Sequence, residues 1–250
     1  MAGDPYGDER LVELYDLDNP GGDDHAYYRA LADGLGAHKI LDLGCGTGLL
    51  TRSLVAPGRA VVGIDPSRTM IGHARRRPGA EAVSWVEGDA RVVAPTGDVD
   101  LVVSSGNTVM HVGDLAFVLR RLAAALRPGG VISFDSRNPA ARVWEGWTRV
   151  ATYDERGTPA GHLREWLELI EVAPDGRVVF DAHNVFPDGR DAVYRNTLYF
   201  RTVDAITGDL PAAGFDDITV RGGWHDEPLS RESRVMVFRA VARCGAGAVG

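Results

Sequence analysis

The sequence predicts an α/β fold in which a doubly wound sheet is followed by an antiparallel β insertion. Between about residues 39 and 135, five short apolar runs alternate with helix-like segments. The runs show no polar alternation, as expected for strands of a parallel sheet that are buried on both faces. Residues 147–201 change to a polar/apolar alternation joined by Pro-Asp-Gly turns at 174–176 and 187–189, which indicates hairpins.

The elements of the first half can be placed from these patterns in order. The five apolar runs are KILDL (39–43), AVVGI (60–64), AVSWV (82–86), DLVVS (100–104) and GVISFD (130–135). The helix-like segments between them include GLLTRSLV, SRTMIGHARRR and DLAFVLRRLAAALRPGG, the last of which ends at a Pro-Gly-Gly stop. This order of elements predicts parallel strands connected by helices.

The flanking segments complete the fold. Residues 1–24 are acidic and rich in loop signals, and residues 25–35 have the spacing of a short amphipathic helix. After the hairpins, TVDAITGDLPAAGF is predicted to be a helix closed by Gly214. The segments DDITVRGG and SRVMVFRAVA then indicate two further strands.

Composition excludes several classes of protein. The chain of 250 residues carries a net charge of −8, which disfavours nucleic acid as the main partner. No run approaches the 18 apolar residues of a membrane span, and the N-terminus lacks the apolar core of a signal peptide. We therefore expect a cytoplasmic protein. Two cysteines and scattered histidines form no recognisable metal site, so we expect no bound metal.

A glycine loop follows the first apolar run directly. Gly44, Gly46 and Gly48 let the backbone approach a ligand closely, and the helix that follows offers unpaired N–H groups. Asp65 directly follows the second run, where its carboxylate is placed to accept hydrogen bonds from ribose hydroxyls. Leu49 stands where a dinucleotide fingerprint has its third glycine, and no Walker motif is present. The loop is therefore predicted to bind a nucleoside-like ligand other than a dinucleotide.

Five motifs in this order resemble those of class I S-adenosylmethionine-dependent methyltransferases of the small-molecule type. They are ILDLGCGTG, GIDPSRTMI, VEGDARVV, DLVVSSGNTVMHV and LRPGGVISFD, within residues 37–136. The resemblance implies S-adenosylmethionine as cofactor and a Rossmann-like seven-stranded sheet with a reversed last strand, consistent with the ending SRVMVFRAVA. It implies these cofactor-binding residues: Tyr15, Asp42, Gly44, Cys45, Gly46, Gly48, Asp65, Pro66, Met70, Asp89, Ala90, Arg91, Ser105 and Gly106.

Within one methyltransferase domain we expect four parts. They are an N-terminal cover (1–36), a cofactor-binding core (37–142), an antiparallel β insertion that acts as an acceptor lid (143–201) and the C-terminal part of the core sheet (202–243).

The acceptor is expected beyond the carboxyl ends of the fourth and fifth strands. His111 is the candidate general base because the pKa of a histidine lies near neutrality; the alternative is that it caps or packs at the start of the next helix. Asp135 could be a structural acid at the end of its strand. The expected substrate-binding residues are Asn107, Met110, Arg137, Asn138, Trp144 and Trp147, with a role in the core of the insertion as the alternative for the tryptophans.

The predicted function is methyl transfer to an oxygen or nitrogen of a small molecule, in bacterial secondary metabolism. The segment SSGNTVM replaces the [N/D]-P-P-[Y/F] motif that grips a flipped base, which disfavours methylation of nucleic acid bases. Two alternatives stay open at this stage: a non-catalytic S-adenosylmethionine-binding or regulatory protein, and an NAD-dependent oxidoreductase. The acceptor and the oligomeric state do not follow from the sequence.

Overall fold

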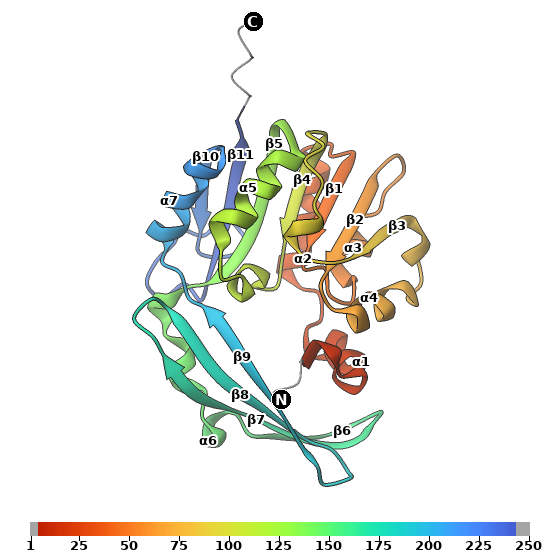
Figure 1. Cartoon of the computed structure of the whole chain (residues 1–250), viewed down its shortest axis with the longest axis vertical. Helices are drawn as coiled ribbons and strands as arrows, with labels where there is room; N and C mark the ends of the chain where they lie inside the picture. The colour runs from red at the N-terminus through yellow and green to blue at the C-terminus, as the bar shows by residue number, and fades with distance from the viewer. Residues whose placement is uncertain (1–4, 244–250) are drawn as a thin grey trace, which may run out of the picture.

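The computed structural model describes residues 5–243 and shows a central sheet with a second, smaller sheet at one end (Figure 1). Residues 1–4 and 244–250, including Cys244, lie outside the described residues. The strands of the central sheet are β1 (Lys39–Leu43), β2 (Ala60–Asp65), β3 (Val83–Glu87), β4 (Val99–Ser104), β5 (Leu126–Arg137), β10 (Phe215–Arg221) and β11 (Val235–Ala242). Their order across the sheet is β10-β11-β5-β4-β1-β2-β3.

The directions of these strands confirm the predicted topology. β1 pairs in parallel with both β2 and β4, and β4 pairs in parallel with β5. The last strand, β11, runs antiparallel to its neighbours β5 and β10. The sheet is therefore seven-stranded with a reversed last strand, and the carboxyl ends of its parallel strands meet at one edge.

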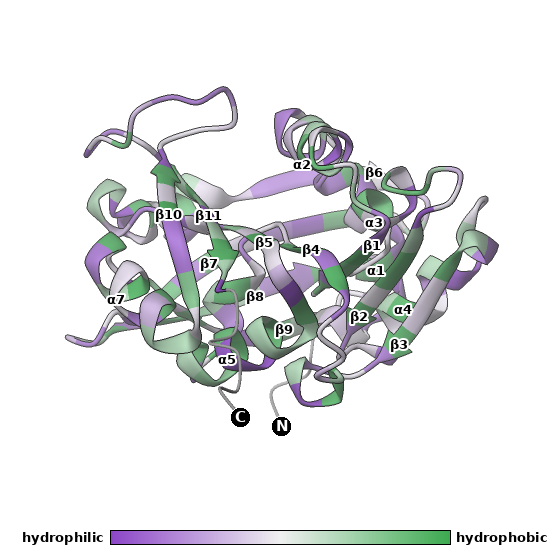
Figure 2. Ribbon diagram, turned by 90° about the horizontal axis from the view of Figure 1, so that it is seen from above, coloured by the Kyte–Doolittle hydropathy of each residue, from purple (hydrophilic) through white to green (hydrophobic). Residues whose placement is uncertain are grey.

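Helices cover both faces of the central sheet. The α-helices are α1 (Glu9–Asp18), α2 (Asp23–Gly34), α3 (Leu49–Ser53), α4 (Arg68–Arg75), α5 (Leu115–Ala125), α6 (Arg149–Thr152) and α7 (Val203–Ala213). The 3-10 helices are η1 (Pro5–Gly7), η2 (Ala80–Ala82), η3 (Ala90–Val92), η4 (Thr108–His111), η5 (Pro139–Ala141) and η6 (Val143–Gly146). Figure 2 shows α2 on one side of the sheet and α5 and α7 on the other. No helix within residues 5–243 is long and apolar enough to cross a membrane.

Side chains that alternate along the strands of the central sheet pack into two apolar cores, one on each face of the sheet. Leu41 and Leu43 of β1 pack in the cluster formed with α5 and α7, whereas Ile40 packs in the cluster formed with α2 and α3. Asp42 shares the face of Ile40 and is fully buried. Strands that carry apolar side chains on both faces are what a doubly wound sheet requires.

The fifth strand is longer than its apolar run of 130–135. α5 ends at Ala125, and β5 begins at the next residue, with a register irregularity beside β4 between Val99 and Leu101. Pro128 explains the early helix end, because a proline disfavours helical geometry at the residue before it.

The inserted sheet follows β5 as predicted. Its strands, in antiparallel order, are β6 (Asp154–Thr158), β7 (Gly161–Val172), β8 (Arg177–Val185) and β9 (Asp191–Tyr199). Gly176 and Gly189, the glycines of the two Pro-Asp-Gly segments, have φ of 84° and 77°, a conformation that glycine adopts readily. An apolar cluster that includes Trp144, Trp147 and Phe200 packs where this sheet meets the rest of the chain.

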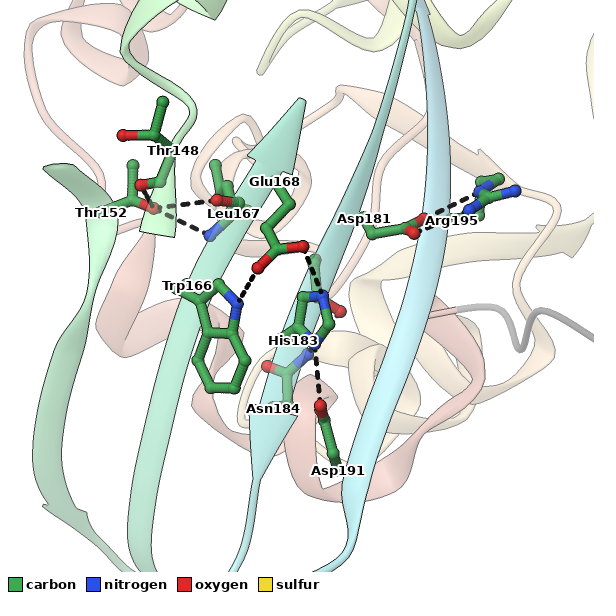
Figure 3. A network of polar contacts seen from close by, with 11 residues as sticks. Thr148, Thr152, Trp166, Leu167, Glu168, Asp181, His183, Asn184, Asp191 and Arg195 are labelled. Atoms are coloured by element: carbon green, nitrogen blue, oxygen red, sulfur yellow. Dashed lines mark hydrogen bonds and ion pairs between the residues drawn. The ribbon is translucent and has the colours of Figure 1, made fainter. Parts of the chain in front are cut away.

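Polar contacts tie the strands of the inserted sheet together (Figure 3). The Trp166 ring stacks on His183 with 4.5 Å between centroids, and its Nε1 donates to Glu168 at 3.0 Å. His183 Nδ1 lies 2.8 Å from Asp191 Oδ2. Because these residues come from three neighbouring strands, the contacts help to hold the register of the inserted sheet.

Candidate functional site

The glycine loop joins β1 to α3 and lines the site. Gly44, Gly46 and Gly48 have φ of 76°, 53° and 74°, in the left-handed region that glycine tolerates. A Cβ on Gly44 would lie 2.2 Å from Thr108 Cγ2, and a Cβ on Gly48 would lie 2.3 Å from the Trp85 ring. The loop therefore accepts no side chain at these two positions.

Asp65, at the end of β2, holds the loop from one side. Its Oδ2 accepts a hydrogen bond from Gly46 N at 2.9 Å, and its Oδ1 accepts one from Ser67 N at 2.8 Å. The residue is only 8% exposed, yet it lines a cavity.

Asp42 lies beneath the loop rather than in a cavity. Its Oδ2 accepts a hydrogen bond from Thr51 Oγ1 at 2.6 Å, and its buried Oδ1 has no hydrogen-bond partner among the described residues. Burial raises the pKa of this carboxyl from 3.8 to about 7. The contacts of Asp42 are thus with the frame of the loop.

Three adjoining cavities run along the carboxyl edge of the sheet, and Gly44, Thr108 and His111 line all three. The apolar cavity (about 470 Å³) is walled by Leu43, Pro66, Ala90, Val112, Phe117 and Val118, with Asp89 and Arg91 also lining it. The middle cavity (about 260 Å³) contains Tyr15, Asp65, Pro66 and Met70. The large cavity (about 580 Å³) adds residues of the N-terminal segment and of the inserted sheet.

A tyrosine–histidine group stands where the middle and large cavities meet. Tyr6 Oη lies 3.4 Å from His111 Nε2, and the two rings meet edge to face with 5.7 Å between centroids. Tyr15 packs edge-on against Tyr6 at 6.4 Å, and burial together with the charge of Asp65 raises the pKa of its phenol. His111 is the last residue of η4 and is exposed to solvent.

Most of the residues expected from the sequence line these cavities. The apolar or middle cavity includes Pro66, Met70, Asp89, Ala90 and Arg91, and the large cavity includes Tyr15, Cys45, Ser105, Gly106, Asn107 and Arg137. Asp89 and Arg91 form an ion pair at 2.5 Å, which holds the pKa of Asp89 below its usual range.

The other expected residues do not line the three cavities: Asp42, Gly48, Met110, Asn138, Trp144 and Trp147. Met110 and the two tryptophans belong to the apolar cluster at the base of the inserted sheet. The Asn138 amide donates to Ser230 O at 3.0 Å and Ser233 O at 2.9 Å. These are packing and anchoring contacts, and the tryptophans take the core position that the sequence left as an alternative.

Several cavity residues were missing from the sequence prediction. They are Tyr6, Asp16, Asp18, Asn19, Asp24 and His25 in the N-terminal segment, Phe117 and Val118 on α5, and Phe180, Asn196 and Leu198 on the inserted sheet. The two-residue alternation of β8 and β9 could have picked out the last three as one face. Within residues 5–243, no group of three or more His, Cys, Asp or Glu side chains is arranged to hold a metal ion.

Comparison with known proteins decides the family. The model of the methyltransferase domain family matches residues 40–130. The chain is 33% identical over 238 residues to a cypemycin N-terminal methyltransferase from Streptomyces sp, covering 92% of this chain and 95% of that protein. The protein is a class I S-adenosylmethionine-dependent methyltransferase. Its methyl donor is S-adenosylmethionine, and the alternative of an NAD-dependent oxidoreductase falls away.

Two further comparisons describe how far the likeness of this methyltransferase extends. It is 29% identical over 165 residues to a ubiquinone biosynthesis O-methyltransferase from Bradyrhizobium diazoefficiens, a match that covers 64% of this chain and 63% of that protein. Its fold matches the CcbJ methyltransferase from Streptomyces caelestis with a TM-score of 0.77 at 19% identity, over 97% of this chain and 100% of that one.

The cavities of the methyltransferase fit this donor. An apolar pocket suits an adenine, the buried carboxylate of Asp65 faces the middle cavity, and the glycine loop leads to the large cavity. S-adenosylmethionine supplies a methyl group activated on a sulfonium, so the protein has to orient an acceptor and exclude water.

Proposed function

We propose that this methyltransferase transfers the methyl group to the amine nitrogen of a small molecule held in the large cavity. The observation that carries the proposal is the charge of that cavity. Asp16, Asp18 and Asp24 line it against a single arginine, Arg137, and two tyrosine hydroxyls stand nearby. Carboxylates attract a protonated amine to a cavity.

Asp24 contributes most to this charge. Asp16 and Asp18 form ion pairs with Arg77 and Arg156. The Asp24 carboxylate accepts from Gly22 N and His25 N, and its charged partner is the His25 ring at 3.9 Å. Burial lowers the pKa of His25, so this ring neutralises Asp24 less than an arginine would. Its carboxylate is therefore the least neutralised of the three.

The donor residues have roles that follow from their positions. We assign the adenine to the apolar cavity with Asp89 at its edge, and the ribose hydroxyls to Asp65. The glycine loop and the backbone of Ser105 and Gly106 then face the methionine part.

His111 is proposed as the general base. A protonated amine must lose a proton before its lone pair can attack, and an imidazole near neutral pKa can accept that proton. Nε2 of His111 points to Tyr6 Oη at 3.4 Å, so the hydroxyl can orient the ring at the junction of the cavities. The leaving group departs neutral, and no acid is needed for it.

We further propose that residues 143–201 act as the acceptor lid together with the N-terminal segment. Phe180 and Leu198 face the large cavity from the inserted sheet. Arg156 pairs with Asp18 of α1 at 2.6 Å, which joins the inserted sheet to the N-terminal segment. Closure from both sides excludes water from the transfer. A cytoplasmic setting in bacterial secondary metabolism stays a prediction.

A panel screen tests the acceptor class. The protein is incubated with S-adenosylmethionine carrying a deuterated methyl group and with matched amines and alcohols, and products are identified by mass spectrometry. We expect the label on nitrogen. Label on alcohols or phenols alone would refute the amine proposal.

Substitution tests the base. His111→Ala should lower kcat while leaving the Kd of S-adenosylhomocysteine nearly unchanged. His162→Ala is the matched control, because His162 is an exposed histidine of the inserted sheet that pairs with Glu155 at 3.4 Å. Full turnover in His111→Ala at neutral pH would exclude the histidine as base.

A further inference from the structure

A side cavity of about 280 Å³ opens beside the large cavity. The two share Asp24, Gly106, Asn107 and Arg137, so a ligand in one can extend into the other. The remaining lining residues are Asp135, Val143, Trp224, Arg234 and Val235. The side cavity therefore lies on the acceptor side of the glycine loop.

Two arginines meet in this cavity from adjacent segments. Arg137 ends β5 and lies opposite Val235 of β11, and Asn138 N donates to Arg234 O at 3.0 Å. The Asn138 amide also binds the backbone of Ser230 and Ser233. Asn138 thus anchors the segment that carries Arg234. Asn138 therefore has a positioning role beside the site.

Neither guanidinium has a hydrogen bond or an ion pair with the residues described, 5–243. Arg137 is half-buried, and its guanidinium carbon lies 5.8 Å from the centre of the Trp147 ring. Burial, and then the charge of Arg234, lower the pKa of Arg137. Two like charges beside one cavity repel each other unless an anion lies between them.

The two carboxylates of the cavity are engaged by other donors. Asp135 accepts from Tyr28 Oη at 2.9 Å and from Asn107 N at 2.7 Å, and burial raises its pKa to about 6. Asp24 accepts from Gly22 N and His25 N. The arginines are therefore the groups of this cavity with donors to spare.

We propose that the side cavity binds an oxyanion of the acceptor, a carboxylate or a phosphate, through Arg137 and Arg234. The acceptor is then an amine that also carries an acidic group. This inference rests on the assignment of the large cavity to the acceptor amine. The planar donor array of arginine matches both oxyanions in two-point geometry, so the chemistry shared by the two sources is what the site recognises.

The competing occupant is the carboxylate of the methyl donor itself. The two occupants predict different effects on donor affinity. If an arginine held the donor carboxylate, replacing that arginine would weaken donor binding. The test therefore measures donor and oxyanion binding separately.

The binding experiment titrates inorganic phosphate, and separately acetate, into the protein saturated with S-adenosylhomocysteine by calorimetry. We expect binding of at least one, weakened about tenfold or more in Arg137→Gln and in Arg234→Gln. The Kd of S-adenosylhomocysteine should stay within twofold. The matched control is Arg239→Gln, an exposed arginine of β11 away from the cavity, which should bind both anions as the parent does.

The outcomes separate the possibilities. Tighter binding of phosphate or of acetate identifies the oxyanion. Binding of neither, equal loss in Arg239→Gln, or a large loss of donor affinity in Arg137→Gln would overturn the proposal. An acceptor without an acidic group in the deuteromethyl screen would overturn it as well. If no amine is methylated, the amine proposal fails, while the anion titration still reports on the arginines.

Discussion

Replacement of Asp65 by alanine is the sharpest test of the donor site. We propose that this carboxylate, which is only 8% exposed, accepts a hydrogen bond from the ribose of the donor. A hydrogen bond to a charged group contributes about 1.5–3 kcal/mol, so the Kd of S-adenosylhomocysteine should rise about 10- to 160-fold.

The structure adds a second consequence of Asp65→Ala. The same carboxylate accepts from Gly46 N and Ser67 N, so the ligand-free protein loses two hydrogen bonds as well. At about 1.5 kcal/mol each, the free energy of unfolding should fall by about 3 kcal/mol. Asp65→Asn keeps a side-chain oxygen for one of the two N–H groups, so its loss of stability should be smaller.

Calorimetry on the folded variants gives the Kd, and urea denaturation of the ligand-free proteins gives the stability. Asp98→Ala is the control, since Asp98 is an acid that pairs with Lys39 at 2.7 Å away from the loop. A Kd within twofold of the parent for both Asp65 variants would refute the ribose role. An unchanged unfolding free energy in Asp65→Ala would refute the anchoring of the loop.

Three further predictions concern the frame around the site. The pKa of Asp42 in the folded protein, about 7, exceeds its ordinary 3.8, so its contribution to stability is full below pH 3.8 and is lost as pH rises through 7. Between pH 5 and 8, the free energy of unfolding of Asp42→Asn, measured by urea denaturation, should therefore rise by about 2–3 kcal/mol relative to that of the parent. A difference in unfolding free energy that stays constant over this pH range would contradict the prediction. Gly48→Ala should cost about 2–4 kcal/mol in thermal unfolding, because the new Cβ meets Trp85 at φ +74°. Gly36→Ala, at φ +56° in open space, should cost less, and equal losses would show that the clash is unimportant. Arg156→Gln breaks the ion pair between the inserted sheet and α1. It should speed the release of S-adenosylhomocysteine in stopped-flow measurements with little loss of stability. An unchanged release rate would show that this ion pair does not help to hold the lid closed.

The donor side could be predicted from the sequence because its signals are local. The glycine loop lies within five residues of β1, and Asp65 directly ends the next strand. Apolar runs locate parallel strands, and parallel strands bring their carboxyl ends to one edge. Fold and donor therefore follow from short-range patterns.

The acceptor side depends on contacts between distant segments. Tyr6 reaches His111 across 105 residues, and Arg234 reaches the side cavity only because β11 returns beside β5. Neither residue sits in a periodic pattern that marks it. Arg137 and Asn138 are neighbours in the chain, yet one lines two cavities and the other anchors the 230–233 segment. That difference is set by the partner strand, which the sequence does not reveal.

The place where the inserted sheet leaves the chain has an evolutionary consequence. The insertion departs after β5 and the chain returns to the central sheet through α7, so changes between these points leave the glycine loop and Asp65 untouched. If residues 143–201 are the acceptor lid, as we propose, then exchanging this stretch as a cassette should change the acceptor while the sequence of the donor half is kept. The exchange is not wholly free, because Asp8 accepts from Tyr194 Oη at 2.6 Å. A transplanted cassette should therefore work best when residues 5–20 are taken from the same parent.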